Sequence, residues 1–485
     1  MVIVGGWSRV VKFLVFGRIR GRPVAQLVRA RSLYLRGRWF ESTPAYICVV
    51  VIFLNKACMV FEQESVRLKS GLSLVKVPMQ TGSVTIMTLI KAGSKDEFEG
   101  KWGAAHFLEH FVFKGTRKFP KVNDVTKVID GIGGKQNAFT WTDFTGFWVK
   151  VASSQFEKGL EVVSQLVSEP LLPQGELEKE KGTIVEEIKM IEDDYPKKAW
   201  RVCQGLLFPD SAIGRPVIGY EETVNSMKRD DLEAFLNRWY TSENMVVVVA
   251  GGLSQVEDLE KQVEDSFAAI GGKRSVEVRE VDPEVFTQDS PRVEVVSKQT
   301  EQAHIMMGLR SFGFEDERVY GLWVANQILG GNMSSRLWNE VREKRGLAYY
   351  VGSGFFAHEQ TGAFYARAGV KLSKVEEAVK VIRGEMLKMA EKKVSDEELI
   401  MGKEGVRGNF LLDLEDSQEV ASFMAEDWAM RKGKTRKVDE VLKAVERVSS
   451  EDIRRIMAEV VVASKFNLSI VGPFGSKDKF VKVMN

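Results

Sequence analysis

Two stretches of the sequence decide the fold: TGFWVKV at residues 145–151 and TGAFYAR at residues 361–367. Each stretch reads as a strand and leads into a helix with apolar residues three and four positions apart, at residues 156–166 in the first copy. Each copy then continues into a second, acidic helix start. A repeated unit of this length indicates the tandem duplication of one domain.

Each copy combines hairpin-like strands with long helices and shows no strict strand–helix–strand alternation. This pattern favours an α+β fold, in which each of two homologous domains has a mainly antiparallel sheet and packed helices. Residues 271–292 are polar, begin with Gly271 and Gly272, and show no sustained apolar period. We therefore expect domains at residues 59–270 and 293–485, joined by a linker at residues 271–292.

Composition excludes several classes of protein. The 485 residues are 44% hydrophobic and 28% charged, which is typical of a globular protein, and three Cys are too few for a disulfide framework. No apolar run reaches the ~18 residues of a membrane span. Ten Lys or Arg and a single acid, Glu41, lie in residues 1–58, so the rest of the chain is net acidic. We therefore expect no nucleic-acid partner and no membrane span.

The basic leader at residues 1–58 has three interpretations. It contains too few Ser residues and too short an apolar stretch to match a transit or signal peptide well. The run at residues 21–42 resembles the peptide obtained when a reading frame crosses a bacterial transfer-RNA gene, which favours a true start at Met59. A real extension is the third interpretation. We expect a bacterial cytoplasmic protein, organellar or exported only if the leader is real.

The strongest chemical signal is HFLEH at residues 106–110, in a chain with only four histidines. On a helix, His106 and His110 share one face, so both imidazoles can reach one cation, and Glu109 lies beside them. The order His-x-x-Glu-His suits a metal-activated water with a neighbouring carboxylate. The alternative is a chance pair of histidines on an amphipathic helix.

A catalytic zinc site needs a third protein ligand. The charged helix expected at residues 177–189 offers several carboxylates, and Glu180 and Glu187 lie two turns apart on one face. The residues alone do not choose among these carboxylates, because a charged helix is most often a solvated face.

With these motifs, the chain from Met59 onward resembles the pitrilysin/insulinase family of inverted-motif zinc peptidases, the inverzincins, and especially the short bacterial type similar to the mitochondrial processing peptidase β subunit. The resemblance implies one Zn²⁺ per chain, held by His106, His110 and Glu187. It also implies that Glu109 is the general base and that Glu180 is a supporting carboxylate at the catalytic site.

The resemblance extends to residues that would bind substrate. GGKQNAFT at residues 133–140 resembles the edge strand of the family, and it implies that a peptide pairs with Asn137, Ala138, Phe139 and Thr140. GGNMSSRL at residues 330–337 and VREKRGLAY at residues 341–349 match the segment whose Arg and Tyr face the peptide, here Arg342 and Tyr349.

The second copy has ANQILG at residues 325–330 in place of the metal motif, and the repeat places Asn409 near the position of Glu187. Only the first copy is therefore expected to bind metal. We expect His304 and His358 to be structural or surface residues, and Cys203 to be a small buried hydrophobe.

The resulting expectation is a zinc-dependent endopeptidase that cleaves unfolded or extended peptides. Long members of the family have four such domains, so this two-domain chain is expected to form a homodimer, or a heterodimer with a related chain. The alternatives are a member of the same fold without catalysis, similar to a respiratory core subunit, and a module that only binds peptides.

Overall fold

The computed structural model describes residues 12–19, 22–29, 62–270 and 287–484. The expectations for the leader and for most of the linker therefore lie outside the described residues. In the leader, only strands β1 (Lys12–Ile19) and β2 (Arg22–Arg29) are described, and they pair antiparallel. They belong to a compact unit separate from the one that begins at Val60.

The first half of this unit contains a six-stranded sheet in the order β3-β4-β8-β5-β7-β6. Strands β4 and β8 are parallel, and every other neighbouring pair is antiparallel. Strand β6 lies at one edge, so only one side of its backbone is paired within the sheet. The strands are β3 (Glu64–Arg67), β4 (Ser73–Pro78), β5 (Ser83–Ile90), β6 (Lys135–Thr140), β7 (Thr145–Ala152) and β8 (Met245–Gly251).

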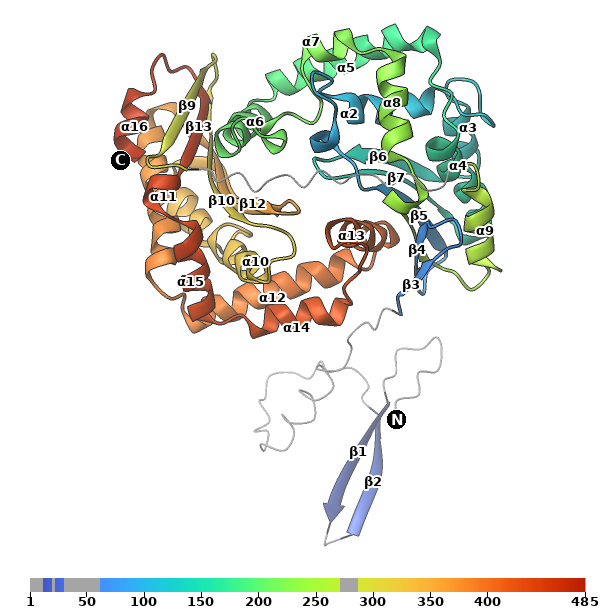
Figure 1. The fold of residues 1–485 in the computed structure, drawn as a ribbon. Coiled ribbons are helices and arrows are strands. Elements are labelled where there is room, and N and C mark those ends of the chain that lie inside the picture. Colours follow the sequence, from blue (N-terminus) through green and yellow to red (C-terminus); the bar gives the residue numbers. More distant parts are fainter. Residues whose placement is uncertain (1–11, 20–21, 30–61, 271–286, 485) are drawn as a thin grey trace. The chain divides into compact units, whose positions relative to one another are not determined.

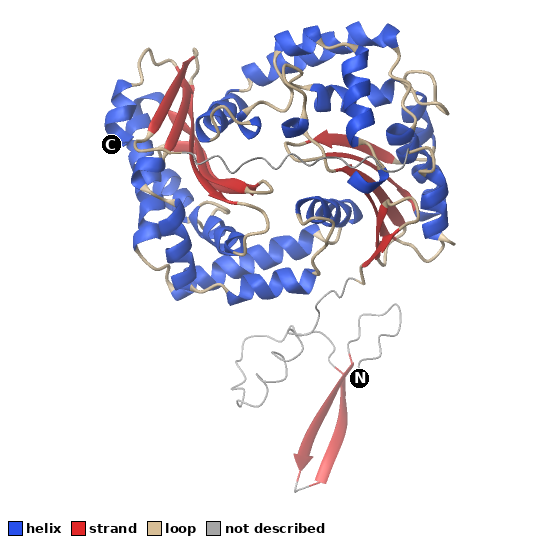
Figure 2. Ribbon diagram, viewed as in Figure 1, coloured by secondary structure: helices blue, strands red, loops and turns tan. Residues whose placement is uncertain are grey.

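The second half repeats this plan with a five-stranded sheet in the order β11-β12-β10-β13-β9. Only β13 and β9 are parallel. The two sheets are mixed but mostly antiparallel, and helices surround both (Figure 2), which confirms the expected α+β class. The strands are β9 (Arg292–Ser297), β10 (Gln302–Phe312), β11 (Ala348–Ala357), β12 (Thr361–Lys371) and β13 (Asn467–Gly472).

The helices form where the sequence places apolar residues on one face. In α4, for example, Leu160, Val163 and Val167 are buried at spacings of three and four residues. None of the described helices is both long enough and apolar enough to cross a membrane. The first-half helices are α2 (Ala104–Phe111), α3 (Asp124–Gly131), α4 (Phe156–Ser168), α5 (Leu177–Asp193), α6 (Tyr195–Leu207), α7 (Glu221–Ser226), α8 (Arg229–Trp239) and α9 (Leu259–Ser266). The second-half helices are α10 (Arg318–Leu329), α11 (Val375–Glu391), α12 (Asp396–Asp413), α13 (Ser417–Met430), α14 (Val438–Arg447), α15 (Ser450–Val460) and α16 (Asp478–Met484).

Each half contributes one helix that packs on the sheet of the other half; α6 and α13 are called the exchanged helices below. Helix α6 of the first half packs on β10 and β13 of the second sheet, and α13 of the second half packs on β5 and β8 of the first (Figure 1). Each exchange builds an apolar cluster with residues from both halves, and Cys203 is buried in one of them, as expected. Because each half completes the core of the other, the halves cannot separate without exposing apolar surface.

A buried group of charges also joins the halves at the turn between β11 and β12. His358 Nδ1 lies 2.5 Å from Asp143 Oδ2, and Lys95 Nζ lies 2.8 Å from Asp143 Oδ1 and 3.2 Å from Glu359. Burial opposes ionisation of Asp143, but His358 and Lys95 outweigh it and lower the pKa of Asp143 to about 2. His358 is thus a buried structural residue between the halves.

Candidate metal centre

Helix α2 carries the histidine motif, and its start is held tightly. Gly103 precedes the helix with φ of +94°, and a Cβ there would lie 2.6 Å from the carbonyl oxygen of Ile218, so the position requires glycine. The buried carboxylate of Glu97 accepts hydrogen bonds from the backbone N–H groups of Gly103 (2.9 Å) and Ala105 (3.0 Å). These bonds satisfy donors that the helix cannot pair internally. They fix the position from which the motif projects.

The structure brings His106, His110 and Glu187 together. Glu187 Oε2, from α5, lies 3.8 Å from His106 Nε2 and 3.6 Å from His110 Nε2. Ligand atoms about 2.0–2.1 Å from a tetrahedral Zn²⁺ are about 3.4 Å apart, which is close to the two distances from Glu187. All three ligand atoms lie within 4.8 Å of one another. Among the described residues, these three form the one group of His, Cys, Asp and Glu side chains placed to hold a metal ion. The residues present therefore fit a zinc ion.

The two histidines differ in protonation. Burial lowers the pKa of His106 to about 3, which favours the neutral imidazole that binds metals. Burial opposes the charged form of His110, but Glu180 and the carboxylates of Glu109 and Glu187 outweigh it and raise its pKa, so a metal ion would have to displace a proton from His110.

His110 Nδ1 lies 3.0 Å from Glu180 Oε1. Glu180 is only 4% exposed, and its other oxygen pairs with Lys114 Nζ at 2.6 Å. Burial opposes the ionised form of Glu180, but these two partners outweigh it and lower its pKa. The ionised carboxylate accepts a hydrogen bond from the Nδ1–H group, which leaves Nε2 of His110 facing Glu187.

Glu109 lies on α2 next to His110 and takes no part in this group of three. Its Oε2 accepts a hydrogen bond from the Thr140 hydroxyl at 2.6 Å. Burial raises the pKa of Glu109, and the hydrogen bond from Thr140 partly opposes that rise. The hydrogen bond from Thr140 thus orients the carboxylate through one oxygen, and no described residue donates a hydrogen bond to the other oxygen.

The four residues predicted to bind substrate lie on the edge strand β6, which is packed beside α2. Asn137, Ala138 and Phe139 pair on one side with Trp148, Phe147 and Gly146 of β7. No described strand pairs with the other side of β6. An extended peptide could add there as a further strand.

The other predicted pair, Arg342 and Tyr349, lies in the second half on irregular backbone. Arg342 belongs to a short π-helix (Trp338–Glu343), and its guanidinium lies 4.1 Å from the centre of the Trp338 ring. Tyr349 is 78% exposed near the start of β11. In the part of the chain that the structure describes, no hydrogen bond or ion pair joins either residue to the metal-binding group.

The second half offers no equivalent metal group in its described residues. Residues 325–329 of α10 are mostly buried, and Asn409 lies on α12, where the repeat places the counterpart of α5. His304 is partly buried, with Nδ1 3.0 Å from the Tyr350 hydroxyl.

Sequence reasoning missed two residues of this centre, Lys114 and Glu97, and one contact, that of Thr140 with Glu109. Lys114 lies four residues after His110, a spacing that could have pointed to a shared face. The contact of Thr140 with Glu109 joins residues 31 positions apart, so no local sequence pattern predicts it. Glu97 accepts hydrogen bonds from backbone N–H groups, which any residue type could donate, so the sequence does not predict this contact either.

The fold and this centre together define a class of protein: metallopeptidases with the inverted histidine motif on a helix and a glutamate ligand from a second helix. Comparison with known families agrees. Residues 75–217 match the family described as Insulinase (Peptidase family M16), and residues 226–406 match the Peptidase M16 inactive domain. The chain belongs to the M16 family.

Relatives support this assignment over most of the chain. A Streptomyces coelicolor protein named as an uncharacterized zinc protease is 33% identical over 419 residues, which are 85% of this chain and 89% of that protein. A Bacillus subtilis protein with the same description is 31% identical over 396 residues, 81% of this chain and 94% of its own length. A protease from Helicobacter pylori has the same fold, with a TM-score of 0.78 at 24% identity, and covers 85% of this chain and 100% of its own.

Proposed function

We propose that this chain is a zinc-dependent endopeptidase that hydrolyses unfolded or extended peptides and binds one Zn²⁺. The observation that carries the proposal is the convergence of His106, His110 and Glu187, with Glu109 beside them and outside the ligand set. A zinc ion, when bound, acts as a Lewis acid and makes a water molecule acidic enough to serve as nucleophile near neutral pH.

The protein supplies the proton transfers. Glu109 accepts the proton of the attacking water on the oxygen that Thr140 leaves free, and it later returns that proton to the leaving amine. Glu180 holds the Nδ1 proton of His110 throughout, so His110 keeps one tautomer. The hydroxyl of Tyr349 donates a hydrogen bond to the substrate carbonyl, and the guanidinium of Arg342 binds a further carbonyl or carboxylate of the peptide.

Strand β6 would select the substrate by backbone pairing. A peptide that adds beside Asn137, Ala138, Phe139 and Thr140 must be extended and must have free backbone groups. Folded proteins do not offer such a segment, so the site would act on unfolded chains.

A dimer would complete the site. Among the described residues, no hydrogen bond or ion pair joins Arg342 or Tyr349 to the metal-binding group, and the exchanged helices and the buried charges oppose a hinge motion between the halves. A second chain, identical or related, could supply both residues across an interface. We therefore propose that Arg342 and Tyr349 serve the metal centre of the partner.

One experiment tests the activity. The protein is incubated with a mixture of unfolded peptides, with and without a chelator, and the products are identified by mass spectrometry. We expect internal cleavage that the chelator abolishes and added zinc restores. Cleavage that persists in the chelator would contradict the proposal, as would zinc binding without any cleavage, which is the outcome for a peptide-binding or non-catalytic member of the family.

A further inference from the structure

The segment that carries Arg342 and Tyr349 has irregular backbone at both residues. In the π-helix, the amide of Lys344 donates to the carbonyl of Asn339, five residues earlier, at 2.9 Å. In β11, Ala348 pairs with Val370 and Tyr350 with Gly369, so Tyr349 is the extra residue of a β-bulge. A π-turn and a β-bulge both re-aim side chains, and regular hydrogen bonding does not fix their geometry. Tertiary contacts must therefore set the directions of Arg342 and Tyr349.

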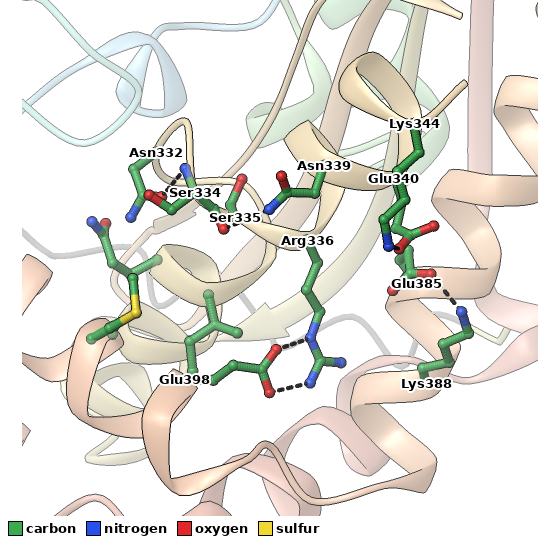
Figure 3. Close-up of a pocket in the computed structure, with 14 residues that line it drawn as sticks. Asn332, Ser334, Ser335, Arg336, Asn339, Glu340, Lys344, Glu385, Lys388 and Glu398 are labelled. Carbon is green, nitrogen blue, oxygen red and sulfur yellow. Dashed lines mark hydrogen bonds and ion pairs between the residues drawn. The ribbon is translucent and has the colours of Figure 1, made fainter. Parts of the chain in front are cut away.

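Two buried apolar side chains anchor the segment at residues 337–350 to the core of the second half. Leu337 and Val341 are fully buried in the core of the second half. On another side, the segment borders a pocket of about 550 Å³, whose polar walls include Asn339, Glu340 and Lys344 (Figure 3). Because a pocket offers no packed neighbour, van der Waals contact does not restrain the segment from that side.

One ion pair crosses this pocket. Arg336, in the turn that leads into the π-helix, donates from Nε and from a terminal nitrogen to the two oxygens of Glu398, at 2.6 and 2.8 Å (Figure 3). Lys344 with Glu340 and Lys388 with Glu385 also line the pocket, but each of these pairs joins residues of one local segment. Among the described ion pairs of the pocket walls, Arg336–Glu398 is therefore the one that joins separate elements.

The acceptor of this pair is itself held in place. Glu398 is the third residue of α12, and its Oε2 accepts a hydrogen bond from the Ser395 amide at 2.9 Å, while the Ser395 hydroxyl accepts one from the Glu398 amide at 3.2 Å. This reciprocal capping fixes the carboxylate to the helix start. A bidentate pair with a planar guanidinium then restricts rotation as well as distance.

We propose that Arg336 is a positioning residue, which acts through Glu398 to hold the π-turn and the bulge so that Arg342 and Tyr349 face the substrate. This inference rests on the proposed function, since it assumes that these two residues contact the peptide. Arg336 itself is paired with Glu398 through two hydrogen bonds, so we assign it no direct contact with the peptide.

The test compares R336K and E398Q with R342A and Y349F, using an unfolded peptide as substrate. Lys keeps the charge of Arg336 but cannot make the bidentate pair. We expect R336K and E398Q to lower kcat/KM about tenfold, because small misplacements of a positioned group are costly. Zinc content and thermal midpoint should remain near those of the unmodified protein. Arg318 pairs with Asp316 and Glu459 on the surface of the same half, so R318K is the matched control and should have no effect.

Two further readouts separate positioning from general weakening. R336K added to the combined R342A and Y349F variant should cause no further loss of activity, because both residues that Arg336 positions are then already changed. A further loss of about tenfold in that background would overturn the proposal. Hydrogen exchange at residues 338–350 should rise in R336K and not in R318K, and unchanged exchange would overturn the proposal whatever the activity. If R342A and Y349F are instead fully active, their assigned role in the proposed function is wrong, and the inference falls with it.

Discussion

The Thr140 hydroxyl donates a hydrogen bond to Glu109 Oε2 across 2.6 Å. This contact joins the last residue of the edge strand β6 to the carboxylate that we propose as the general base. A peptide paired with β6 would therefore be placed relative to the base by the same strand that orients the base. The position of the bound peptide and the orientation of the base therefore both depend on β6.

Thr140→Val tests this relationship, because it removes the hydroxyl and keeps the branched shape. A hydrogen bond to a charged group contributes about 1.5–3 kcal/mol, so we expect kcat to fall at least about tenfold while zinc content stays the same. Thr81→Val, in the exposed turn before β5, is the control and should leave kcat unchanged, because among the described residues its hydroxyl contacts only the nearby Ser83. Wild-type kcat in Thr140→Val would show that the contact does not orient the base.

The Lys114–Glu180–His110 chain should set zinc affinity. Glu180→Gln removes the negative charge that holds the Nδ1 proton of His110, and changes of this kind cost about 10–100-fold in metal affinity. Lys114→Met should have a smaller effect in the same direction, since Glu180 then loses one of two partners. Competition with a chelating dye measures both. Lys121→Met on the exposed surface is the control, and equal affinities in all four proteins would refute the assignment.

The lowered pKa of Asp143 predicts that the free energy of unfolding depends on pH. Its pKa in the folded protein is about 2, below the ordinary value of 3.8, so its ionised form stabilises the fold above about pH 4. This contribution is lost as the pH falls from about 4 to about 2. Asp143→Asn should lower the free energy of unfolding by about 2 kcal/mol at pH 7, and the difference should shrink in acid. Urea unfolding at pH 7 and pH 3 measures it, with the exposed Asp130→Asn as control; a difference that grows in acid would contradict the assignment.

The sequence predicted the features that depend on local periodicity and residue spacing, which are the repeated strand–helix unit and the histidine motif. The duplicated strand and helix appear as β7 with α4 and as β12 with α11, and His106, Glu109 and His110 share one helix as their spacing required. The choice of Glu187 over the other carboxylates of α5 needed the family resemblance, because several acids share that helix.

Contacts between distant parts of the chain could not be read in this way. Helix α6 is amphipathic and α13 is mostly buried, but the sequence pattern does not reveal that each packs on the sheet of the other half. The pairing of His358 with Asp143 joins residues 215 positions apart, and the sequence alone predicted only a structural or surface histidine.

Subunit exchange tests the shared site. One chain carries Glu109→Gln, and the other carries Arg342→Ala with Tyr349→Phe. If the pair acts across a dimer, each mixed dimer has one intact site, so random pairing should restore about a quarter of all sites by symmetry. If both residues act within their own chain, every site keeps a lesion. No recovery of activity, with mixed dimers demonstrated by native mass spectrometry, would contradict the shared site.

The central claim is that metal binding and proton transfer belong to different carboxylates of this centre. The most direct test measures zinc content and peptide hydrolysis in Glu109→Gln and Glu187→Gln, side by side with the unmodified protein. We predict that Glu109→Gln keeps one zinc per chain and loses activity by several orders of magnitude, whereas Glu187→Gln loses zinc itself. An equal loss of zinc in both variants would contradict the account, because Glu109 would then be a ligand and not the base.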